Sequence, residues 1–152
     1  MIAVSINDVM VAYAADAIDL ARHGFGTELD FSEASIERVE EMLSGYEASL
    51  PRGLVARMFG RQPQQEHLWQ LSKIWGAYVG EVIRARWGGE WVSRRGTHRG
   101  PDISLVVLGL VLAPPGKVYR RLMLGIEENI CHYYEVVKRD LLRAQDTRSR
   151  QQ

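Results

Sequence analysis

Apolar residues recur at helical spacing near the start of the chain, and they predict a first helix over residues 6–21. Ser5 and Asp8 precede this stripe with the spacing of a capping box, in which each side chain can bond the other residue's backbone N–H. Gly24 stands where a left-handed C-terminal cap is usual. The sequence therefore predicts an amphipathic helix with both ends marked.

Two more helices are predicted between residues 32 and 87. The second begins near Ser32, a good N-cap, and ends around residues 48–50. The third covers residues 64–87, and its apolar side chains occupy nearly half of its circumference, so we expect it to be central. Gly76 and Gly80 lie about one turn apart in it and predict a close approach of another backbone.

After residue 89 the period changes from helical to extended. Alternating residues over 90–95 and a β-branched run over 103–108 predict a hairpin, with residues 95–101 as its turn. Residues 110–112 are expected to add a short third strand, because the two prolines at 114–115 cannot donate to a sheet.

The rest of the chain returns to helical spacing, with a short helix predicted over 116–124 and a longer one over 126–144. We expect an α+β fold in which N-terminal helices and a long central helix pack on a small antiparallel sheet of 2–3 strands, followed by C-terminal helices. Residues 1–145 are predicted to form a single domain, and 146–152 a disordered polar tail.

Composition is typical of a globular protein, with 46% hydrophobic and 25% charged residues in a chain of 152. The longest apolar run, residues 103–115, is broken by Gly109 and is too short to cross a membrane. Asp8 and other polar residues interrupt the N-terminal stretch, which disfavours a secretory signal. The single cysteine, Cys131, agrees with a reducing compartment. We therefore expect a cytoplasmic protein.

The formal net charge of zero hides a strong asymmetry along the chain. Residues 1–50 carry ten acidic and two basic side chains, whereas residues 51–100 carry three acidic and nine basic ones. Segregated charge can create opposed surface fields that steer charged partners, or the segments can neutralise each other in the folded protein.

Patterns of catalytic or metal-binding chemistry are missing. The four histidines have no partner at helical metal-ligand spacing: His23, His67, His98 and His132. Cys131 and His132 are neighbours on a predicted helix, so they point about 100° apart and cannot act as a nucleophile and its base. Phosphate-binding glycine loops and nucleophile elbows are also missing. We predict no catalytic residue, no metal and no cofactor.

Two charged groups are candidates for binding a partner. Four acids on one side of the second helix form a predicted acidic stripe: Glu33, Glu37, Glu40 and Glu41. Basic residues crowd the predicted hairpin turn: Arg94, Arg95, His98 and Arg99. Each group either is simply solvated or docks a surface of opposite charge. The neutral total charge and the lack of aromatic residues between the arginines disfavour nucleic acid as the partner.

Glu81 borders the apolar arc of the third helix, where partial burial is expected. The simpler interpretation is that it pairs with Arg84 or accepts a hydrogen bond from a donor in a neighbouring loop, either a backbone N–H or a tryptophan. The alternative is a cleft in which this carboxylate meets the indoles of Trp87 and Trp91, as in a small enzyme or a ligand-binding domain.

Three stretches together resemble an uncharacterised bacterial domain family of small α+β proteins. They are YAADAIDLARHGFGTELDFSEASIERVEEML at 13–43, WGAYVGEVIRARWGGEWV at 75–92 and PPGKVYRRLMLGIEENICHYYEVV at 114–137. The resemblance carries over no catalytic residues, since the family has no assigned chemistry. Some similar small bacterial proteins are immunity partners of toxins.

Our leading hypothesis is a protein-binding module, most concretely an immunity-type protein that neutralises a bacterial toxin encoded nearby. The alternatives are a small enzyme or ligand-binding domain near Glu81, and a homo-oligomeric structural protein.

Overall fold

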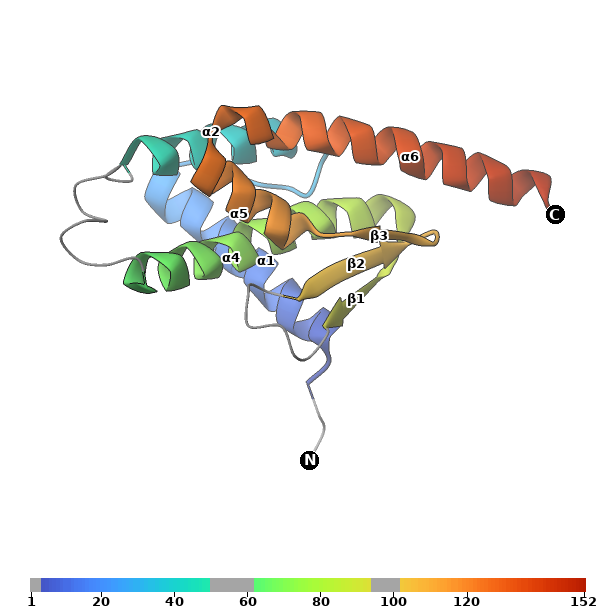
Figure 1. Cartoon of the computed structure of the whole chain (residues 1–152), viewed down its shortest axis with the longest axis horizontal. Helices are drawn as coiled ribbons and strands as arrows, with labels where there is room; N and C mark the ends of the chain where they lie inside the picture. Colours follow the sequence, from blue (N-terminus) through green and yellow to red (C-terminus); the bar gives the residue numbers. More distant parts are fainter. Residues whose placement is uncertain (1–3, 50–61, 94–101) are drawn as a thin grey trace.

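The computed structural model describes residues 4–49, 62–93 and 102–152. In chain order its elements are α1 (Ile6–Phe25), α2 (Ser35–Ser49), α4 (Gln62–Trp87), β1 (Glu90–Ser93), β2 (Ile103–Val107), β3 (Leu110–Leu112), α5 (Pro114–Leu124), the 3₁₀ helix η1 (Ile126–Glu128) and α6 (Ile130–Arg150). Helices precede and follow a small antiparallel sheet, as Figure 1 shows. The predicted α+β class is therefore confirmed.

Helix α1 begins with the predicted capping box. The Ser5 hydroxyl oxygen accepts a hydrogen bond from the Asp8 backbone N–H at 3.1 Å, and the Asp8 carboxylate accepts one from the Ser5 backbone N–H. The predicted C-terminal cap is wrong by two residues. Gly24 remains inside the helix, and Gly26, with a φ of 62°, takes the left-handed conformation and donates its N–H to the Arg22 carbonyl.

The sheet has the strand order β1-β2-β3, with both pairs antiparallel. Trp91 of β1 lies opposite Leu105 of β2, which lies opposite Leu112 of β3. Between β2 and β3, Leu108 and Gly109 both have positive φ, at 49° and 82°. Two such residues make the tight hairpin turn that matches the twist of the strands, so β3 can follow β2 at once. The predicted third strand is confirmed.

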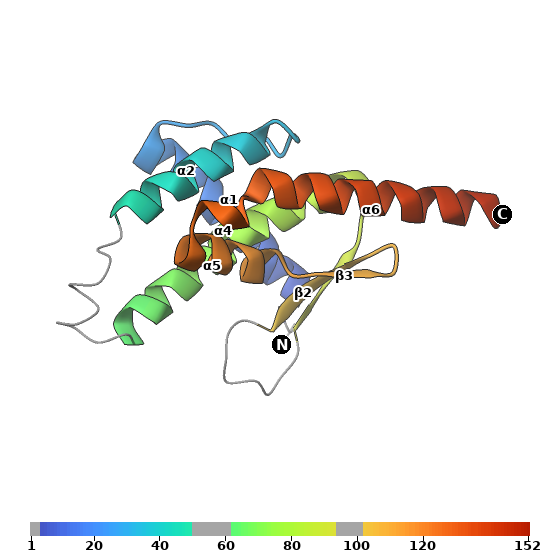
Figure 2. The same ribbon diagram turned by 45° about the horizontal axis from the view of Figure 1, so that its top comes forward.

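Helix α4 is the centre of the fold, as its long apolar face predicts. Trp75, Tyr78 and Ile83 are fully buried, and α4 makes its most extensive contacts with α1 and α5. Figure 2 shows the ribbon of α4 alongside the ribbons of both helices. The buried cluster around it also takes in side chains of α2, α6, β1 and β2.

Gly76 and Gly80 allow the close approaches that their spacing predicts. A Cβ atom at Gly76 would lie 2.4 Å from the Cα atom of Pro115, at the start of α5. A Cβ atom at Gly80 would lie 2.2 Å from the ring of Trp91, which is a side chain and not the backbone that we expected. Both distances are far inside van der Waals contact, so only glycine fits at these positions.

Helix α6 is longer than predicted. It continues to Arg150, so the prediction of a disordered tail over 146–152 is wrong for residues 146–150. No proline or glycine interrupts this stretch, and the Asp146 carboxylate pairs with Arg150 one turn later at 3.1 Å. Figure 1 shows α6 running beyond the sheet to the C-terminus.

In the three described segments, no helix has both the length and the apolar character needed to cross a membrane.

We predict opposite effects of alanine at two helical glycines. Gly76→Ala should lower the free energy of unfolding by about 1–3 kcal/mol, because the new methyl group collides with the backbone of α5. Gly24→Ala should raise it by about 0.5–1 kcal/mol, because this site has no atom within 4 Å and alanine restricts the unfolded chain. Urea denaturation of both variants measures the difference, and equal effects would contradict the close α4–α5 contact.

Candidate functional site

A buried ion pair joins three helices. Arg121 of α5 is fully buried, and its Nε donates to Oε1 of Glu40 of α2 at 2.7 Å. The second carboxylate oxygen of Glu40 accepts the backbone N–H of Ile130, the first residue of α6, at 2.9 Å. Arg121 Nη2 also donates to the hydroxyl of Ser44 at 2.8 Å. The pair therefore fixes how α2, α5 and α6 meet.

Glu40 was expected to lie on an exposed acidic stripe of the second helix, and the expectation that it is exposed is wrong. Only 8% of the residue is exposed. Glu40 follows Ile36 by four positions and precedes Leu43 by three, so helical geometry places it on the buried face of α2. The spacing from Ile36 and Leu43 was the signal in the sequence that Glu40 is buried.

The sequence reasoning also missed Arg121. This arginine follows Val118 by three positions and lies beside Leu122, and both of these residues are buried. The apolar stripe of α5 was the available signal, because it places Arg121 on the face that packs inward. A buried arginine needs a charged partner, and Glu40 supplies it.

Glu33 lies just before α2 and is already neutralised by the chain itself. It accepts hydrogen bonds from the Tyr134 hydroxyl at 2.9 Å and from Lys138 Nζ at 3.1 Å, and it pairs with Arg86. Burial raises the pKa of Glu33, but these three partners outweigh burial and hold its pKa below the usual value. Glu33 thus ties the start of α2 to α4 and α6.

Glu37 and Glu41 are exposed on α2, in agreement with the predicted stripe. Glu135 of α6 is exposed as well, and it lines the same hollow as Glu37 and the Cys131 side chain. None of the ion pairs found among the described residues uses these three acids. We call Glu37, Glu41 and Glu135 the acidic face.

The hollow in the acidic face has a volume of about 280 Å³. It is lined by residues of α6, of α2 and of the turn that precedes α2: Glu33, Ala34, Ile36, Glu37, Cys131, Tyr134 and Glu135. Helix α2 packs beside α6, so side chains about 95 positions apart in the sequence meet here.

The pKa of the Cys131 thiol is shifted by the acids of this face. Burial raises the pKa of its thiol, and the charges of four glutamates raise it further: Glu40, Glu37, Glu135 and Glu41. A thiol with a raised pKa stays protonated at neutral pH and is a weak nucleophile. The acids around Cys131 therefore create a negative field and disfavour thiol chemistry.

The second predicted partner-binding group cannot be placed. Arg94, Arg95, His98 and Arg99 lie outside the residues that the structure describes.

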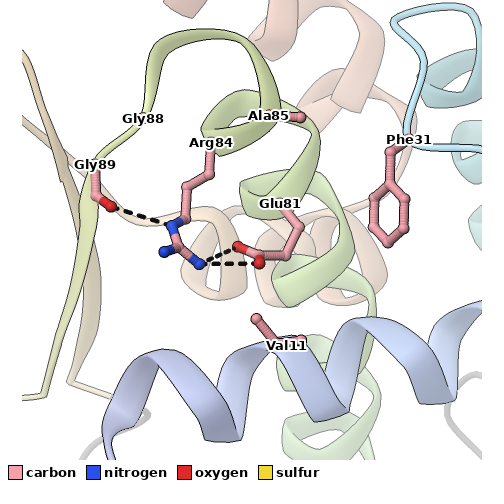
Figure 3. A pocket seen from close by; sticks show the side chains of 7 residues that line it. All are labelled: Val11, Phe31, Glu81, Arg84, Ala85, Gly88 and Gly89. Atoms are coloured by element: carbon pink, nitrogen blue, oxygen red, sulfur yellow. Dashed lines mark hydrogen bonds and ion pairs between the residues drawn. The ribbon is translucent and has the colours of Figure 1, made fainter.

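Glu81 has both of the partners that the sequence suggested. Its two carboxylate oxygens each accept a hydrogen bond from Arg84 Nη1 at 2.9 Å, and Oε2 also accepts one from Trp91 Nε1 at 3.0 Å. A second hollow, of about 540 Å³, lies next to this pair (Figure 3). Trp87 and Trp91 do not line it, so this hollow beside Glu81 differs from the predicted cleft, in which the carboxylate meets both indoles.

Within residues 4–49, 62–93 and 102–152, no three His, Cys, Asp or Glu side chains are grouped so that they could hold a metal ion.

Comparisons with protein-family models, with curated proteins and with solved structures found no match to this chain. The resemblance of residues 13–43, 75–92 and 114–137 to a bacterial family therefore stays a prediction.

We predict that Glu40→Gln lowers the free energy of unfolding by about 3–5 kcal/mol, because it removes the negative charge that pairs with the buried guanidinium of Arg121. Glu41→Gln, one residue along the same helix but exposed, is the matched control and should change stability by less than about 0.5 kcal/mol. Urea denaturation compares the two variants. Similar losses of stability would show that the buried pair does not hold α2, α5 and α6 together.

Proposed function

We propose that this protein is a protein-binding module whose acidic face binds a basic surface of a partner protein. Its most concrete form is a cytoplasmic immunity-type protein that neutralises a bacterial toxin encoded nearby. The observation that carries the proposal is the acidic face itself, where Glu37, Glu41 and Glu135 surround Cys131 and form no ion pair with another described residue.

The contrast with the other glutamates supports this proposal. Glu40 and Glu81 lie on helices and Glu33 lies in the turn before α2, but each is bonded by lysine, arginine or backbone donors of the same chain. The acids of the acidic face have exposed carboxylates that act together on Cys131. Unpaired like charges in one place repel each other, and a partner with complementary charge relieves that repulsion and binds faster.

The hollow next to Cys131 suggests how a partner could be positioned. At about 280 Å³ it lies slightly below the usual size range of small-molecule sites, which begins near 300 Å³. A lysine or arginine side chain would place its apolar stem along Ile36 and its charged end among the carboxylates. The acidic face could therefore provide an anchoring point as well as a steering field.

The immunity-type form of the proposal depends on the family resemblance given above, which suggests toxins as partners. A ligand-binding role is a second candidate, favoured by the hollow beside Glu81. A homo-oligomeric structural role is a third, and a solution mass of about 17.3 kDa for the isolated protein would exclude it.

We predict that the protein forms a complex with the product of a neighbouring gene and protects cells that express that product. In the complex, Glu37→Lys combined with Glu135→Lys should slow association by about tenfold or more at low salt, because the steering field is reversed. Stopped-flow association at several salt concentrations measures this change. The difference from the wild-type rate should shrink as salt screens the charges.

The matched control is Asp16→Lys combined with Asp19→Lys, two exposed acids on α1 that undergo the same change of charge. The control pair should retain most of the wild-type association rate. Equal slowing in both pairs would show that only net charge matters, and it would rule out the acidic face as the docking site. A failure of every neighbouring gene product to bind would contradict the immunity-type form.

A further inference from the structure

The hollow beside Glu81 is a second candidate site, and it does not depend on the proposed function. It lies where α1, the segment before α2 and the C-terminal end of α4 come together, with a volume of about 540 Å³. That volume is within the range of about 300–1,000 Å³ found for small-molecule sites. Figure 3 shows Val11 on one side, Phe31 on another, and Glu81, Arg84 and Ala85 along α4.

The polar part of this hollow is a fixed and electrically neutral pair. Arg84 Nη1 donates to both oxygens of Glu81, and Arg84 Nε donates to the Gly89 carbonyl at 3.1 Å. Trp91 Nε1 holds the carboxylate from the sheet side. The side chains of Arg84 and Glu81 are only 22% and 12% exposed. A charged ligand would therefore bring a charge with no counterion into a partly buried site.

The pair still has hydrogen-bonding capacity for a ligand. From the described residues, Oε1 of Glu81 accepts a single hydrogen bond, donated by Arg84, although a carboxylate oxygen can accept two. In the described part of the chain, Nη2 of Arg84 donates to nothing, and Figure 3 shows it without a dashed line. One acceptor and one donor thus remain on neighbouring groups.

The apolar part of the hollow presents an aromatic ring. Phe31 stacks on Tyr78, with ring centroids 5.0 Å apart and planes at 20°, and 37% of Phe31 is exposed. Its φ of 62° is rare for a residue with a side chain. The Phe31 N–H donates to the Tyr78 hydroxyl at 2.8 Å, and this bond helps to hold the strained conformation. Strain of this kind clusters at binding sites.

From these observations we infer that the hollow binds an uncharged, planar aromatic compound with a carboxamide or lactam edge. The ring stacks on Phe31 and contacts Val11 and Ala85. The N–H of the edge donates to Oε1 of Glu81, and its carbonyl accepts from Nη2 of Arg84. Because the protein pair carries no net charge, the neutral ligand is preferred over its charged analogues.

The test is an NMR titration of the ¹⁵N-labelled full chain with benzamide and three analogues of similar shape. Benzamide should shift the amide signals of residues around Phe31, Glu81 and Gly89, with a Kd of about 10 mM or below, as suits a ligand of this size. Benzoate, benzylamine and acetophenone should bind about tenfold more weakly, because the first two carry a charge and the third lacks the N–H donor.

Ala85→Phe supplies the matched variant, because Ala85 is an exposed helical residue whose enlargement fills the hollow without disturbing the core. It should abolish the benzamide shifts, whereas Gln145→Phe, which adds a ring at an exposed position of α6, should leave them unchanged. The inference is overturned if benzamide causes no shifts at the hollow, if Ala85→Phe still binds it, or if benzoate or benzylamine binds equally well.

Discussion

The salt bridge between Glu40 and Arg121 is the constraint on which the arrangement of the C-terminal half depends. A guanidinium that is fully removed from solvent must keep its carboxylate partner, and that carboxylate also accepts the first backbone N–H of α6. Helix α2 must therefore lie against both α5 and α6 at this point. One consequence is structural, since buried polar groups lock the three helices together. The other concerns the surface, because Glu37 of α2 and Glu135 of α6 come to line the same hollow beside Cys131.

Some glutamates of this protein form hydrogen bonds and ion pairs that hold the fold together, and others are exposed and can contact a partner. Glu33 and Glu40 connect helices, and Glu81 fixes the position of Trp91 against Gly80. What remains exposed near Cys131 are Glu37, Glu41 and Glu135, which form no ion pair with another described residue. The segment before α2 lies between the two candidate sites. Phe31 lines the hollow beside Glu81, Glu33 lines the one beside Cys131, and the Tyr78 hydroxyl holds this segment by accepting from Phe31 and donating to Ser35 at 2.7 Å.

Periodicity predicted the elements well because each helix and strand buries one face, and burial imposes its spacing on the sequence. The same spacing indicates that Glu40 is buried. The charge of four nearby acids, in contrast, suggests a solvated stripe that includes it. The partner of Glu40, Arg121, lies 81 positions away in the sequence. The two side chains meet only because of how α5 crosses α2, and no local sequence pattern encodes that crossing. The end of α6 was missed because a polar composition suggests fraying, whereas local ion pairs sustain the helix. Of the residues that line the hollow beside Glu81, the sequence pointed only to Glu81 and Arg84. Phe31 could not be predicted, because its left-handed conformation accompanies a contact with Tyr78, which is distant in the sequence.

The central claim is that the acidic face carries a negative field that no ion pair within residues 4–49, 62–93 and 102–152 neutralises. Cys131, the single thiol, can measure that field directly. The rates of its modification by a cationic trimethylammonium and an anionic sulfonate methanethiosulfonate reagent should be compared in the folded protein and in the urea-unfolded chain. We predict that folding raises the ratio of the cationic to the anionic rate by about tenfold at low salt and that added salt removes this gain. A ratio that is the same in the folded and unfolded chains would contradict the claim.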